Sequence, residues 1–135
     1  MFQFKLKNPR FLSKKARRIC LLISLSFFCA TLLLFSFYRP YVYVHNINDF
    51  HFSDSFTNFT AVPAVTFFVV ALDGKMRYTF AASVMAVCLG LIAYEFIGFT
   101  FDVYDILATV VSGVFTMIGI KILFQRFEKS GMFIA

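Results

Sequence analysis

Three acidic residues stand in or beside apolar stretches of the sequence, and they are the residues most capable of chemistry: Glu95, Asp102 and Asp105. A carboxylate costs about 2.5–3.5 kcal/mol at the centre of a membrane helix, so its presence there needs a reason. Glu95 stands near the end of one apolar run and the two aspartates open the next, after a turn of only a few residues. We therefore expect the three carboxylates to gather at one interface of a membrane, as candidates for binding a ligand.

The two aspartates have a structural explanation that Glu95 lacks. Asp102 suits the N-cap of the following helix, and Asp105 can reach back from three residues on, as in a capping box. Both also complement the positive end of the helix dipole. Glu95 lies near the C-terminal end of its helix, where the dipole disfavours an anion, and this makes it the strongest functional candidate.

Other residues that carry out chemistry are sparse. His45 and His51 could approach the acids from a loop and form a metal or proton-handling cluster, but two histidines six residues apart indicate this only weakly. The cysteines lie in apolar stretches without the spacing of a zinc or redox site: Cys20, Cys29 and Cys88. No nucleophile elbow, H-E-x-x-H pair or Gly-rich phosphate loop is present. We predict no metal and no cofactor, and the sequence favours a role other than that of an enzyme.

The elements that must position the carboxylates are membrane helices. The chain has 135 residues, of which 60% are hydrophobic and only 15% charged, whereas soluble domains have about 45–50% and about 25%. Apolar runs predict an all-α polytopic bundle of four transmembrane helices, at residues 19–38, 56–72, 78–97 and 103–124. The second run is the shortest and contains Pro63, and Arg39-Pro40 is expected to end the first.

Basic residues set the expected orientation of the bundle. Residues 1–18 form a flank with seven Lys and Arg side chains and no acid, and residues 125–135 form a short tail with Arg126 and Lys129. With residues 19–124 as the transmembrane domain, all of the 13 lysines and arginines except Arg39 lie on or near one side. The positive-inside rule then predicts that both termini are cytoplasmic and that the carboxylates face outward.

Small residues predict how two of the helices pack. Membrane helices associate where small residues recur every four positions, because their backbones can then approach closely. The third span carries Ala82, Ala86 and Gly90 in such a stripe, and the fourth carries Thr109 and Gly113. We expect these two stripes to face each other.

The segment YEFIGFTFDVYDILAT, residues 94–109, resembles the signature of VanZ-like membrane proteins. In that family an E-x-x-Q element ends one helix, and an arginine and a D-x-x-D element followed by an asparagine open the next. The matching positions are Glu95, Asp102, Asp105 and, for a later glycine, Gly113. Gly98 stands in place of the glutamine, Thr109 in place of the asparagine, and the arginine is missing.

The resemblance implies a protein of the bacterial inner membrane with a polar cluster on its outer face. The family is linked to resistance against glycopeptides such as teicoplanin, but it does not supply a reaction. Two alternatives remain open from the sequence: a non-enzymatic accessory subunit of a larger membrane complex, and a phage or toxin-system protein of the immunity or holin-like kind. The expected partners are membrane lipids and a larger membrane protein or a second copy of the chain. Nucleic acid is not expected, because the basic residues flank apolar spans.

Overall fold

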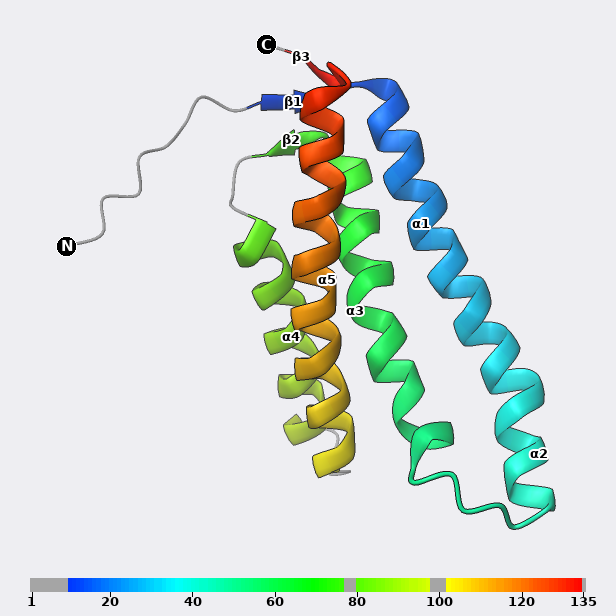
Figure 1. Ribbon diagram of the computed structural model, residues 1–135. Coiled ribbons are helices and arrows are strands. Elements are labelled where there is room, and N and C mark those ends of the chain that lie inside the picture. Colours follow the sequence, from blue (N-terminus) through cyan, green and yellow to red (C-terminus); the bar gives the residue numbers. More distant parts are fainter. Residues whose placement is uncertain (1–9, 77–79, 98–101, 135) are drawn as a thin grey trace.

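The apolar runs of the sequence form four main helices, which pack as an all-α bundle with a small sheet at one end (Figure 1). The computed structural model describes residues 10–76, 80–97 and 102–134. Three helical stretches are long and apolar enough to cross a membrane: Lys14–Val44, Phe52–Asp73 and Val103–Lys129. The chain therefore has the helices of an integral membrane protein.

The first helical stretch is longer than predicted. It consists of α1 (Lys14–Leu33), a π-helical turn η1 (Leu34–Tyr38) and α2 (Arg39–Val44). The prediction that Arg39-Pro40 ends the helix is wrong. The amide of Arg39 bonds the carbonyl of Leu34, five residues earlier, and Pro40 stands in the first turn of α2, where its missing N–H costs little.

Helix α3 (Phe52–Asp73) lies at the centre of the bundle and contacts α1, α4 and α5. Half of the residues in its apolar segment are buried, compared with 11% in the first helical stretch and 28% in α5. The shortest predicted span is therefore the most enclosed helix. Pro63 removes one backbone donor, and the hydroxyl of Ser112 on α5 donates to the carbonyl of Phe59, four residues before the proline. A neighbouring helix thus satisfies the carbonyl that the proline leaves free.

Helices α4 (Phe80–Ile97) and α5 (Val103–Lys129) pack against each other. Of the predicted third span, residues 78–79 lie outside the described residues, while α5 runs five residues beyond its predicted end at residue 124. A Cβ added to Gly113 would lie 2.7 Å from the Sγ of Cys88 and 3.8 Å from Val84, so the backbone of α5 approaches α4 closely at this glycine.

The small residues of α4 lie elsewhere than predicted. Ala82, Ala86 and Gly90 are exposed, and a Cβ at Gly90 would have no neighbour within 4 Å. The side of α4 that meets α5 contains Val84 and Cys88 instead. These residues stand two positions after Ala82 and Ala86 in the sequence. Residues two apart point to different sides of a helix, so the predicted stripe of α4 faces away from α5. Thr109 and Gly113 of α5 are buried.

A three-stranded antiparallel sheet closes the end of the bundle where the described N- and C-terminal segments lie (Figure 1). The strands are β1 (Arg10–Leu12), β2 (Lys75–Met76) and β3 (Phe133–Ile134), in the order β2-β1-β3. Phe11 pairs with Lys75 on one side and with Ile134 on the other. These segments are not simply a flank, a turn and a tail, as the sequence indicates, but are joined to one another through their backbones.

Candidate functional site

The candidate site lies at the end of the bundle opposite the sheet, which we call the loop-side end. There α3, α4 and α5 bring together four polar side chains, here named the loop-side cluster: Ser55, Asn58, Glu95 and Asp105. Each helix contributes residues because its loop-side terminus reaches the same level of the bundle (Figure 1). The cluster therefore joins segments that are far apart in the sequence.

Glu95 is the most enclosed acid of the cluster, with only 7% of its surface exposed. It comes from the last turn of α4, and the Nδ2 of Asn58 on α3 donates to its Oε1 at 3.4 Å. Burial of a carboxyl is costly unless a partner compensates it. Asn58 supplies one long hydrogen bond, which leaves acceptor capacity on the carboxyl for a further donor.

Asp105 turns its carboxyl inward from the first turn of α5. Its Oδ1 is fully buried and, within the described part of the chain, has no hydrogen-bond partner of good geometry; the same holds for the Oγ of Ser55. Ser55 and Asn58 are the polar side chains of α3 within reach of this carboxyl, and Asp54 and Asp102 add negative charge nearby. Asn58 therefore stands between the two carboxyls, and the hydroxyl of Ser55 and the carboxyl of Asp105 lie close enough to pair with each other.

Asp102 has the structural role that the sequence predicts for it. It is the N-cap of α5 in extended backbone geometry, and its Oδ1 accepts a hydrogen bond from the amide of Tyr104 at 2.8 Å. Asp105 departs from the predicted capping box, because its side chain points to α3 instead of serving the helix start. Of the two aspartates, Asp105 is thus the candidate for ligand binding.

A second group of charges borders the cluster closer to the loop. Arg39 of α2 pairs with Asp54 of α3 at 3.2 Å, and the hydroxyl of Tyr43 donates to the same carboxylate. His51 lies 4.0 Å from Asp54 and stacks on the ring of Tyr104, with 4.5 Å between the ring centroids. The single basic residue expected on the outer side therefore neutralises an acid there.

The histidines do not join the predicted carboxylates. His45 contacts the carbonyl of Tyr41 through its Nδ1, at 2.9 Å, and His51 meets Asp54 instead of Glu95 or Asp105. In the residues that the structure describes, no group of three His, Cys, Asp or Glu side chains could hold a metal ion. The geometry favours binding of a hydrogen-bond donor or an organic cation over coordination of a metal.

The sequence indicates both acids of the cluster but not their partners on α3. Ser55 and Asn58 stand three residues apart, which places them on one side of a helix. Helix α3 begins at Phe52, whereas the predicted span begins at residue 56. The prediction therefore leaves Ser55 in the outer loop and puts Asn58 at the very start of the span. Asp49 is the signal for an earlier helix start, because its Oδ2 accepts a hydrogen bond from the amide of Ser53 at 2.7 Å. A helix that starts there includes both Ser55 and Asn58.

Comparisons with known protein families, curated proteins and solved structures find no match for this chain. Of the positions that carry the VanZ-like resemblance, Gly98 and residues 99–101 lie outside the described residues. The acids Glu95, Asp102 and Asp105 and the residues Thr109 and Gly113 are described.

Proposed function

We propose that this chain is a VanZ-like protein of the bacterial inner membrane that binds a cationic or hydrogen-bond-donating group at its loop-side cluster. The observation that carries the proposal is the burial of Glu95, which receives one long hydrogen bond from Asn58, with the carboxyl of Asp105 within reach of the same amide. Ionisable residues inside membrane domains are costly and usually serve a function. The proposed role is protection against glycopeptide-type or other envelope-directed agents.

Four spans and cytoplasmic termini belong to this proposal. Helix α4 has 18 residues, which corresponds to about 27 Å at 1.5 Å per residue, close to a hydrocarbon core of about 30 Å. It runs from the sheet end to the loop-side end, antiparallel to α5 (Figure 1). The described basic residues other than Arg39 lie toward the sheet end, so the positive-inside rule places the sheet in the cytoplasm and the cluster outside.

The decisive experiment replaces Glu95 by Gln in the organism that carries the gene. Gln keeps the size of the side chain and an acceptor for Asn58 but removes the charge, so we expect lower resistance to envelope-directed agents at unchanged membrane levels. Asp73→Asn is the matched control, because it removes an exposed carboxylate at the other end of α3. Equal susceptibility of wild type, Glu95→Gln and Asp73→Asn would refute a functional cluster.

A second candidate function is that of an accessory subunit of a larger membrane complex. The outward stripe of Ala82, Ala86 and Gly90 favours it, because small residues on an exposed helix allow close approach by another helix. Purification in a mild detergent should then recover a stoichiometric companion, and Gly90→Leu should release it. Recovery of the chain alone in repeated preparations would count against this function.

A further inference from the structure

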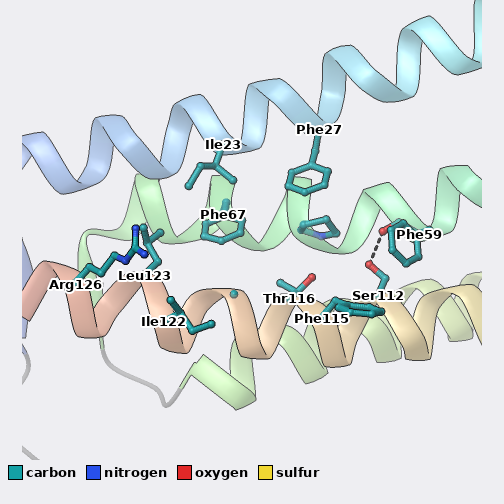
Figure 2. Close-up of a pocket in the computed structure, with 12 residues that line it drawn as sticks. Ile23, Phe27, Phe59, Phe67, Ser112, Phe115, Thr116, Ile122, Leu123 and Arg126 are labelled. Atoms are coloured by element: carbon teal, nitrogen blue, oxygen red, sulfur yellow. Dashed lines mark hydrogen bonds between the residues drawn. The ribbon is translucent and has the colours of Figure 1, made fainter.

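An open apolar groove runs along the bundle between α1 and α5, away from the loop-side cluster. Figure 2 shows Ile23 and Phe27 of α1 on one side of it, Phe59 and Phe67 of α3 along its floor, and residues of α5 on the other side. Its volume is about 540 Å³, within the range of about 300–1,000 Å³ that is usual for small-molecule sites. The groove is thus large enough for a molecule and not only for a side chain.

The groove exists because α1 and α5 are both fixed to α3. On one side, Ser24 of α1 donates to the carbonyl of Ala64 at 2.8 Å, and Thr31 bonds Thr60 at 2.7 Å. On the other, Ser112 of α5 donates to the carbonyl of Phe59. These bonds use the polar groups of the three helices for helix packing, so the surface left between α1 and α5 is almost wholly apolar.

Gly119 of α5 keeps the groove open. It lines the groove, and a Cβ added there would have no neighbour within 4 Å. A side chain can therefore start from this position into open space, where a larger one would fill part of the groove. In a chain with membrane-spanning helices, an apolar groove of this kind faces acyl chains and not water.

The sheet-side end of the groove carries a free positive charge. Arg126 lines the groove there and is exposed (Figure 2). Within the described part of the chain, its guanidinium has no ion pair and no hydrogen bond. Lys129, three residues further along α5, and Lys15, two helical turns before Ile23 on α1, extend the basic surface at the same end.

We infer that this groove is a binding site for one anionic phospholipid, with an acyl chain lying along the aromatic floor and the phosphate at Arg126. Basic pockets between membrane helices bind anionic headgroups, and the planar guanidinium matches a phosphate with two parallel hydrogen bonds. The charge at one end and the apolar length beyond it together require a ligand with both an anionic head and a long tail. The site depends on the membrane location of the chain but not on the function of the loop-side cluster.

Native mass spectrometry of the delipidated full chain, titrated with phosphatidylglycerol or phosphatidylethanolamine of identical acyl chains, tests this site. We expect one phosphatidylglycerol to bind before any other lipid and more tightly than phosphatidylethanolamine. Arg126→Gln should weaken phosphatidylglycerol binding about fivefold, the usual effect of one basic residue near a lipid surface. It should weaken phosphatidylethanolamine binding less, because the ammonium of that headgroup already offsets the charge of its phosphate. Lys121→Gln is the matched control, because Lys121 is exposed on α5 but does not line the groove.

Gly119→Leu tests the tail of the lipid separately and should reduce the binding of both lipids. Gly90→Leu, at a glycine with equally open surroundings on α4, should leave both unchanged. Equal affinity for the two lipids, or wild-type binding by either Arg126→Gln or Gly119→Leu, would overturn the proposal. Displacement of phosphatidylglycerol by millimolar inorganic phosphate would also overturn it, since the site would then recognise the anion alone. Loss of resistance in Glu95→Gln would be unaffected by any of these outcomes.

Discussion

The two ends of the bundle are held together by different kinds of contact. At the sheet end, strands pair through their backbones, and Arg17 of α1 donates to the carbonyls of Ala71 at 2.7 Å and Leu72 at 2.9 Å in the last turn of α3. Among the described residues of the loop-side end, side chains connect α3 with α4 and α5, through Asn58, Glu95 and Asp105. Backbone contacts fix an end in place, whereas partly satisfied side chains leave an end able to bind something else.

Removal of Arg17 should have the largest effect on stability. Its guanidinium caps α3 with two charge-assisted bonds and packs against Gly74, where a Cβ would lie 3.2 Å from its Cδ. Arg17→Ala should lower the free energy of unfolding by about 2 kcal/mol, as measured by denaturation with SDS in mixed micelles. Arg18→Ala, at an exposed neighbour, should cost much less; equal losses would mean that the cap does not hold this end.

Truncation of Glu95 should destabilise the loop-side end by a smaller amount. Glu95→Ala leaves the half-buried amide of Asn58 without this acceptor, at a cost of about 1 kcal/mol in the same unfolding measurement. Glu95→Gln should recover most of that stability because it keeps an acceptor. Asn58→Ala combined with Glu95→Ala should cost less than the sum of the two single changes, and strict additivity would show that the two side chains do not interact.

The hydroxyl of Ser112 links α5 to α3 between the two ends. Ser112→Ala leaves the carbonyl of Phe59 unpaired beside Pro63, and bonds of this kind between membrane helices contribute about 0.6 kcal/mol on average. We expect a loss of that size, measured by the same denaturation. Ser26→Ala should have no effect, because Ser26 is exposed and bonds only the carbonyl of Leu22 in its own helix. If Ser112→Ala lowered the free energy of unfolding as much as Arg17→Ala, the contact at the centre of the bundle would be as important for stability as the sheet end.

The exposed pair between Arg39 and Asp54 should have the smallest effect. Its side chains remain about one third exposed, so the pair should contribute less than about 1 kcal/mol. Arg39→Gln should lower stability slightly at low salt and not at high salt, because salt screens exposed charges. A loss that persists at high salt would indicate that Arg39 acts mainly through packing on Phe35 and Tyr43.

The helices can be predicted from the sequence because each is a long apolar run, but the sheet cannot. Strands of two or three residues have no measurable period, and the pairing of Phe11 with Lys75 and Ile134 depends on where four helices bring the chain. The end of the first helix differs from its prediction for a local reason: Pro40 ends a helix in most contexts, but here it follows a π-helical turn.

The candidate site can be predicted only in part. Glu95 and Asp105 stand out because acids are expensive in apolar surroundings, and the structure buries Glu95 and encloses one carboxyl oxygen of the half-buried Asp105. Ser55 and Asn58 belong to residue types that are common in loops. They can be recognised as part of the site only when α3 is known to begin at Phe52. The outward position of Ala82, Ala86 and Gly90 depends on the rotation of α4, which a pattern of small residues does not determine.

The three strands of the sheet are synthesised at different times. Strand β1 is made first, yet its partner β2 emerges only after α1 and α3, and β3 only after α4 and α5. Local helices can form as they leave the ribosome, and β1 can pair with β2 once α3 has been made, but the other edge of β1 stays unpaired until α5 is complete. The third strand therefore completes the sheet only after α5 has been made.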